Sequence, residues 1–248
     1  MASSPCVGSH LNLDAIEQDL FDFPDRALLH ALRYGADMGY SGQNKSSEWP
    51  NHKSSAEAAK QIEEQIKSEL KEGIIGGGGP SWEAFGFDHF RCSPLGAVAK
   101  RGTSEVRRVD DNSFKDGINA DINDMPTMRF TTVDLVAKEV VRMKREHEVV
   151  QLAKVDIRKA YRNFPVRPQD WWLLGFKWKQ QYYFHRRLPF GTRSSPHWFA
   201  RLSVVDCWAL AALLPPHAVV YAYLDDFIVV GAPQSYAATR NILTSLLA

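Results

Sequence analysis

The stretch Val219–Gly231, VVYAYLDDFIVVG, places two adjacent acids, Asp225 and Asp226, inside an otherwise apolar run. The β-branched and aromatic residues on both sides predict two short buried strands that meet at the acidic pair. Ionised carboxylates are rarely buried without a partner, because losing hydration costs several kcal/mol per ion, and adjacent carboxylates also repel each other. The pair therefore predicts a cation, most simply a divalent metal ion, and a partner acid elsewhere in the chain.

A candidate for the partner acid follows another apolar run. Residues 149–155 predict a strand, and Asp156 stands at its end. An acid at the end of a core strand is a common place for a catalytic group, whereas the alternative is an N-cap for a helix over 158–161. If Asp156 converges with the pair 69 residues further on, the three acids could bind two divalent ions that promote in-line displacement at phosphorus.

Composition limits the class of protein. The 248 residues are 44% hydrophobic and 24% charged, which is ordinary for a globular protein. No apolar stretch reaches the ~18 to 20 residues that span a bilayer, and the N-terminus lacks the pattern of a secretory signal, so we expect no membrane partner. Cys6, Cys92 and Cys207 lie far apart, which argues against a zinc site or disulfide framework. Their spacing suits a reducing compartment, so we expect an intracellular location, nuclear or cytoplasmic.

The net charge of +1 hides an asymmetry along the chain. Residues 1–75 carry 7 Lys/Arg against 12 Asp/Glu, whereas the remainder carries 23 against 17. The basic residues gather in three stretches: Lys100–Arg108, Arg142–Arg145 and Arg158–Arg167. Basic clusters among aromatic residues suit a polyphosphate backbone, and the alternative for each cluster is a solvated surface.

Periodicity and turn residues predict further elements. Helices are expected near 25–34, over 55–72 with Gly73 as the C-terminal stop, and over 132–147. Strands are expected over 95–100 and 106–109. The tract Gly76–Pro80 is expected to be a flexible loop without regular structure.

Three motifs resemble the palm motifs of reverse transcriptases in order and spacing: VDIRKAY at 155–161, LPFGTRSSPHWF at 188–199 and YLDDF at 223–227. Upstream, KEGIIGGGGPSW at 71–82 and SPLGAVAKRGTSEVRRVDDNSF at 93–114 resemble the lead-in helix and fingers strands of the same enzymes. The sequences of residues 23–42, 156–166 and 172–178 look most like those of the DIRS-like retrotransposon branch. The glycine tract and the extra acid in Val109–Asp111 depart from the pattern.

The resemblance implies an α+β fold with the fingers and palm of a right-hand polymerase, in which helices pack on one face of an antiparallel palm sheet. Because the chain ends at Ala248, soon after Asp226, the resemblance also implies a C-terminal truncation without thumb or ribonuclease H domain. The implied segments are 1–59 (N-terminal region and linker), 60–121 (fingers, first part), 122–163 (palm, first part), 164–190 (fingers, second part) and 191–248 (palm, second part, incomplete).

The resemblance also implies roles for particular residues. Asp156, Asp225 and Asp226 would be the catalytic acids and would bind two Mg²⁺ ions, or Mn²⁺. The carbonyl of Ile157 would add a ligand, and Asp226 would contribute more to local charge than to direct ligation.

Five more residues would contact the nucleotide: Lys100, Arg107, Tyr161, Phe190 and Gly191. Lys100 and Arg107 would meet the triphosphate, since a guanidinium can grip phosphate oxygens in bidentate fashion and an ammonium acts as a point charge. Tyr161 would crowd a ribose 2′-hydroxyl and select deoxynucleotides. The alternatives are surface cations and a core tyrosine.

The residues that follow also have implied places. Ser194, Ser195 and Pro196 would open the helix that supports template and nucleotide. Trp171, Trp172, Tyr182 and Tyr183 could stack on bases, with core packing as the alternative.

The implied function is template-directed addition of deoxynucleotides to a primer 3′-hydroxyl, with an RNA or DNA template, a primer and deoxynucleoside triphosphates as partners. One alternative is a catalytically inactive retroelement fragment that retains nucleic-acid binding. Another is an unrelated metal-dependent nuclease.

Overall fold

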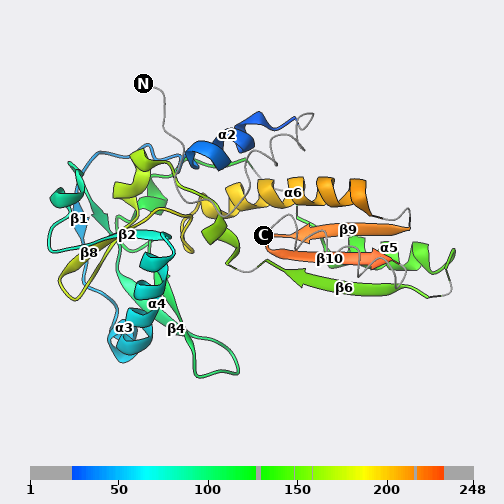
Figure 1. Cartoon of the computed structure of the whole chain (residues 1–248), viewed down its shortest axis with the longest axis horizontal. Helices are drawn as coiled ribbons and strands as arrows, with labels where there is room; N and C mark the ends of the chain where they lie inside the picture. Colours follow the sequence, from blue (N-terminus) through cyan, green and yellow to red (C-terminus); the bar gives the residue numbers. More distant parts are fainter. Residues whose placement is uncertain (1–23, 127–129, 148, 158, 215–216, 232–248) are drawn as a thin grey trace. The chain divides into compact units, whose positions relative to one another are not determined.

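The computed structural model describes residues 24–126, 130–147, 149–157, 159–214 and 217–231 (Figure 1). Within them the chain forms two compact units, and each is described by itself. Unit 1 contains residues 30–125 and 161–195, and unit 2 contains the described parts of 24–29, 126–160 and 196–231. The units divide near residues 125, 160 and 195, and the expected fingers and palm limits at 121, 163 and 190 stay predictions.

Unit 1 combines short helices with two small sheets. Its helices and 3₁₀ turns are α3 (Lys53–Glu57), α4 (Ala59–Lys71), η1 (Glu83–Phe85), η2 (Ile118–Ala120) and η4 (Pro168–Leu173). Its strands are β1 (Ser47–Glu48), β2 (Ile75–Gly79), β3 (Arg91–Cys92), β4 (Leu95–Ala99), β5 (Val106–Asp110), β7 (Gly175–Trp178) and β8 (Gln181–His185). One sheet has the order β1-β3-β7-β8-β2, and β4 pairs with β5 in an antiparallel hairpin.

The helix predicted over 55–72 is present as α3 and α4, which divide at Ala58. Ile62 and Ile66 lie one turn apart on α4 and are both buried in a core with Phe176 of β7. Gly73, with a φ of +69°, ends the helix as predicted, because glycine adopts left-handed backbone angles without a Cβ penalty.

The expectation of a loop at Gly76–Pro80 is wrong, since β2 runs through this tract and pairs with β8. The strand is irregular, with a register shift between Gly77 and Gly79 and a φ of +101° at Gly77. A Cβ at Gly76 would meet the ring of Phe184 at 2.5 Å. Glycine is used here because the backbone must lie against an aromatic ring and bend, both of which a side chain opposes.

Unit 2 is built on an antiparallel three-stranded sheet in which β10 (Asp226–Gly231) lies between β6 (Gln151–Asp156) and β9 (Ala218–Tyr223) (Figure 1). Helix α5 (Val133–Met143) begins at the N-cap Thr132 and packs Val136 and Met143 against Val230 of β10. The helix predicted over 132–147 is therefore confirmed but ends earlier. The α+β class is confirmed as well.

Three elements begin or lie at the divisions between the units: α2 (Arg26–Tyr34), η3 (Ala160–Asn163) and α6 (Ser195–Leu213). The start of α6 agrees with the prediction that Ser194, Ser195 and Pro196 open a helix, because proline is tolerated in a first turn. In the part of the chain that the structure describes, no helix combines the length and apolar character needed to cross a membrane.

Helix α6 buries one acid that the sequence analysis did not single out. Asp206 is 8% exposed, and its Oδ2 finds no hydrogen-bond partner among the described residues. Burial raises the pKa of Asp206 from 3.8 to about 7. The folded state then holds this proton more tightly than the unfolded state, so stability is full below the unfolded pKa and falls as pH rises toward the folded one.

We expect Asp206→Asn to remove this pH dependence. At pH 8 the variant should be more stable than the parent by a few kcal/mol, and at pH 4 the two should be nearly equal. Urea unfolding of both proteins at a series of pH values measures the difference, and Asp134→Asn, on an exposed turn of α5, controls for the substitution itself. A difference that does not change with pH would contradict a buried, protonated Asp206.

Candidate active site

The acidic tip of unit 2 brings together the three predicted acids. The register of β6 and β10 places Asp156 directly opposite Asp226, and Asp225 precedes Asp226 at the turn. One carboxylate oxygen from each residue lies within 4.8 Å of the others. The two predicted strands that meet at the acids are β9 and β10, so the geometry expected from VVYAYLDDFIVVG is confirmed.

The hairpin that carries the acids is held from two sides. Leu224, in the turn between β9 and β10, has a φ of +54°, which is unfavourable for a residue with a branched side chain. The buried hydroxyl of Ser203 on α6 donates to the carbonyl of Leu224 at 2.8 Å. The N–H of Ile157 donates to the carbonyl of Asp225 at 3.1 Å. These bonds to main-chain oxygens fix the turn while they leave the carboxylates unused.

The expectation of buried acids is wrong in degree. Asp156 is exposed, Asp225 and Asp226 are half-buried, and Tyr223 beside them is 50% exposed. The flanking apolar residues of β10 are buried instead, with Phe227 at 0% and Val229 at 2% exposure. The apolar run thus supplies the strand, whereas the strand ends supply the opening to solvent.

Electrostatic repulsion marks the three acids as a site with excess negative charge. Partial desolvation, followed by the charges of Asp225 and Asp226, raises the pKa of Asp156 above its ordinary value. Lys154, two residues earlier on the same face of β6, lies 2.8 Å from Asp226 with its Nζ and offsets part of the charge. The sequence analysis missed Lys154, although the alternation of the strand places it beside Asp156.

The donor set suits a hard divalent cation. Carboxylate oxygens are the preferred ligands of Mg²⁺ and Mn²⁺, and three of them at this separation gain by sharing a cation. The carbonyl of Ile157 accepts from the N–H of Ala160 at 3.3 Å, which leaves its second lone pair for a ligand. Asp226 has Lys154 as its partner, whereas Asp156 and Asp225 form no ion pair with a cation among the described residues.

In unit 1, three residues predicted to contact the nucleotide lie together: Tyr161, Arg107 and Phe190. The ring of Tyr161 lies 4.9 Å from the ring of Phe190, and the guanidinium of Arg107 lies 5.8 Å from it. Gly191 has a φ of +88°, and a Cβ there would approach the carbonyl oxygen of Asp110 to 2.7 Å. A side chain at position 191 would therefore push this segment away from β5.

Lys100 stands apart from that group. It follows β4 at the hairpin turn, where its Nζ pairs with Glu105 at 2.6 Å. Both side chains are well exposed, so the pair is weak and can exchange for a phosphate. The acids Asp156, Asp225 and Asp226 belong to unit 2, whereas Lys100, Arg107, Tyr161, Phe190 and Gly191 belong to unit 1.

Of the four aromatic residues that could stack on bases, two are buried in the core and two are half-buried. Tyr182 and Tyr183 are buried in two core clusters, which supports core packing for both. Trp171 is half-buried and stacks on Phe184 with ring centroids 5.5 Å apart. Trp172 is half-buried and meets Tyr40 edge to face.

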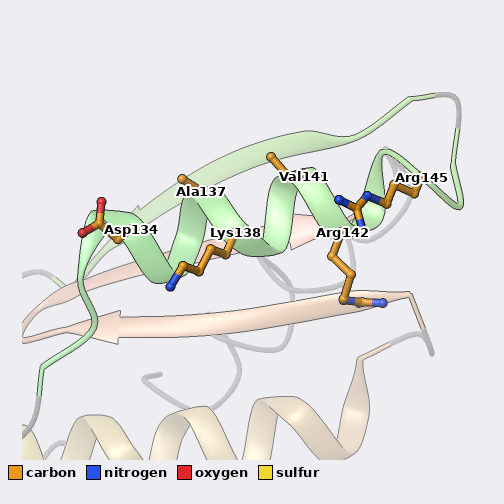
Figure 2. A pocket seen from close by; sticks show the side chains of 6 residues that line it. All are labelled: Asp134, Ala137, Lys138, Val141, Arg142 and Arg145. Carbon is orange, nitrogen blue, oxygen red and sulfur yellow. The ribbon is translucent and has the colours of Figure 1, made fainter.

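Each of the three basic stretches contains residues that pair with acids, as Lys100 does with Glu105. A groove of about 470 Å³ follows the outer side of α5, and Figure 2 shows the side chains that line it: Asp134, Ala137, Lys138, Val141, Arg142 and Arg145. Arg142 in this groove is bonded to Glu139 on α5 and to Glu146 in the turn after it, so much of its charge is paired with nearby acids. In the stretch Arg158–Arg167, Arg162 is buried and Arg167 pairs with Asp37 and Asp170.

The extra acid in Val109–Asp111 is explained by two opposite environments. Asp110 is buried and bonded to His185, whereas Asp111 is half-exposed and lies 3.0 Å from His52. The sequence analysis missed His185, because its partners are 75 and 23 residues away in the chain.

No protein-family model matches the chain, and no curated protein matches it. The fold is similar to that of the prototype foamy virus protease-reverse transcriptase CSH mutant, with a TM-score of 0.60, 21% identity, and coverage of 84% of this chain and 24% of that one. For the native prototype foamy virus protein the values are 0.58, 18%, 96% and 30%. For the foamy viral protease-reverse transcriptase dRH in complex with ds DNA they are 0.58, 18%, 84% and 32%.

At such identities the likeness concerns the fold. The chain has the fingers-and-palm fold of reverse transcriptases, and it spans between 24% and 32% of the length of these three proteins.

The acidic tip makes a prediction about metal binding. Lys154→Met should strengthen Mn²⁺ binding about three- to tenfold, because it removes a competing cation and frees Asp226. Asp225→Asn should weaken binding about tenfold or more, because it removes a charged ligand. Titration with Mn²⁺, followed by electron paramagnetic resonance, measures both, and Lys138→Met on exposed α5 is the matched control. Unchanged affinity in both variants would place the bound ion elsewhere.

Proposed function

We propose that the chain is a reverse transcriptase-like nucleotidyltransferase that adds deoxynucleotides to a primer 3′-hydroxyl under the direction of an RNA or DNA template. The observation that carries this proposal is the cluster of Asp156, Asp225 and Asp226 at a hairpin tip, in a fingers-and-palm fold. A fold alone does not define an activity, but three converging carboxylates supply the donors that phosphoryl transfer needs.

Two divalent ions, Mg²⁺ or Mn²⁺, would activate the attacking hydroxyl and stabilise the leaving pyrophosphate. Asp156 and Asp225 would hold them, with the carbonyl of Ile157 as a further donor, and Asp226 would adjust the charge through its pair with Lys154. The protein forms no covalent bond in this reaction, and its contribution is to position the reactants and stabilise charge.

The nucleotide would meet the surface around Phe190. Arg107 is exposed and pairs with no carboxylate among the described residues, so its planar guanidinium suits phosphate oxygens. Lys100 would exchange Glu105 for the triphosphate. Tyr161, held against Phe190, would present its ring to the sugar, and Gly191 would let the backbone approach the base.

Several finer assignments belong to the same proposal. We propose a retrotransposon origin in the DIRS-like branch, on the motifs quoted above, and an intracellular site of action. The ds DNA in the foamy viral complex supports a nucleic-acid partner. Thumb and ribonuclease H domains would complete the enzyme.

We expect the chain to extend an oligo(dT) primer on poly(rA) with dTTP and Mg²⁺ or Mn²⁺. Asp225→Asn should abolish extension, whereas Asp88→Asn, the same change at an exposed site of unit 1, should leave it intact. A primer-extension gel measures both. Salt-sensitive RNA binding without extension would instead support an inactive fragment that retains nucleic-acid binding. Cleavage without extension would support a nuclease.

Sugar selectivity tests the place of Tyr161. Tyr161→Val and Tyr161→Ala should raise the ratio of ribonucleotide to deoxynucleotide incorporation about tenfold or more, because the ring that excludes the 2′-hydroxyl is gone. Tyr161→Phe keeps the ring and should keep the selectivity. Parallel single-nucleotide incorporation with dTTP and UTP gives the ratio, and equal ratios in all four proteins would remove Tyr161 from the sugar site.

A further inference from the structure

Unit 1 contains a connected cluster of buried charges from four elements, α4, β5, η3 and β8. Its members are Glu69, Arg108, Asp110, Arg162 and His185. The last four are between 1% and 8% exposed, and the side chain of Glu69 is 18% exposed. Charges are kept at such depth only where each has partners, so the contacts among these residues hold the four elements in fixed places.

The imidazole of His185 joins two of those elements. Arg162 donates from Nη1 to Nδ1 of His185 at 2.7 Å. A guanidinium cannot accept a hydrogen bond, so Nδ1 must be the acceptor and the ring proton lies on Nε2. Nε2 then donates to Oδ1 of Asp110 at 3.1 Å. Burial lowers the pKa of His185, which agrees with a neutral ring.

The remaining contacts balance the charges. Arg108 donates to Glu69 at 2.9 Å, and Arg162 lies 3.6 Å from the same carboxylate. Burial alone would raise the pKa of Asp110, but His185 and Arg108 outweigh it and hold the pKa below its ordinary value. Two carboxylates therefore face two guanidinium groups, and a neutral His185 connects Asp110 to Arg162.

The cluster lies directly behind the surface around Phe190. On β5, exposed Arg107 precedes buried Arg108, because neighbouring strand residues face opposite ways. On η3, Tyr161 likewise precedes buried Arg162. The carbonyl of Asp110 is the group that confines Gly191. Displacing Arg162 or Asp110 therefore displaces Tyr161 and Gly191 as well.

We propose that His185 is a positioning residue, which bonds Arg162 to Asp110 and thereby fixes Tyr161, Phe190 and Arg107 as one surface for the sugar and phosphates of a deoxynucleoside triphosphate. The identity of the ligand rests on the proposed function. The positioning of the surface does not.

The test compares three variants of the full chain. His185→Met keeps similar volume and removes both hydrogen bonds, whereas His185→Gln keeps an acceptor and a donor at the end of its side chain. Ile66→Ala, in the core of the same unit, supplies a loss of melting temperature without removing a hydrogen bond or ion pair of the cluster. If His185→Met does not fold, His185→Asn takes its place, because its shorter side chain cannot reach both partners.

Two readouts separate positioning from general stability. The nuclear Overhauser effect between the rings of Tyr161 and Phe190 reports the surface itself, and titration with dTTP and Mg²⁺ reports its use. His185→Met should lose the ring contact and weaken dTTP binding about tenfold, whereas His185→Gln should stay within about threefold of the parent. Ile66→Ala should keep both.

The proposal is overturned if His185→Met keeps the ring contact, or if Ile66→Ala loses ring contact and affinity to the same extent. A parent chain that shows the ring contact but binds no dTTP would contradict the proposed function. In that case the ring contact in the variants alone decides the role of His185.

Discussion

The mutual repulsion of three carboxylates is the constraint around which unit 2 is built. The pairing of β6 with β10 forces Asp156 to face Asp226, and the turn adds Asp225 within 4.8 Å. Among the described residues, Lys154 of β6 offsets part of that repulsion. The sheet, the packing of α5 and the bond from Ser203 to the turn hold the acids together against it. Because the fold holds the three carboxylates together against their repulsion, binding of a divalent cation would relieve that repulsion and be favourable.

In unit 1, by contrast, the buried charges of opposite sign lie close to one another. Its two buried carboxylates face two guanidinium groups, and the neutral ring of His185 connects Asp110 to Arg162. Such a network is rigid, because breaking one bond leaves a buried charge without its partner. Because Arg107 neighbours buried Arg108 on β5, the network also fixes the backbone that carries exposed Arg107 beside Phe190. The two units thus combine an open cluster of like charges with a closed network of opposite ones, which suits cation binding and substrate positioning, respectively.

Local patterns predicted the parts of this structure that depend on neighbours in the sequence. The strands around Asp225 and Asp226, the helix with Ile62 and Ile66, and the stop at Gly73 all follow from periodicity and backbone preference. The glycine tract of β2 was misassigned, because glycine disfavours strands except where a ring such as Phe184 leaves no room for a Cβ. His185 escaped notice because its role depends on partners distant in sequence, which no local pattern reveals. The role of Asp156 was predicted from the chemistry of the acidic pair, which needs a further acid to share a cation, and not from a local pattern alone.

The central claim, that Asp156 and Asp225 hold a divalent ion, is tested most directly by anomalous diffraction. Crystals of the chain grown with Mn²⁺ and dTTP would be measured at the manganese absorption edge. The account predicts an anomalous peak within coordination distance, about 2.2 Å, of carboxylate oxygens of both residues. Manganese bound at other residues, with the three carboxylates of the tip free of any peak, would contradict it.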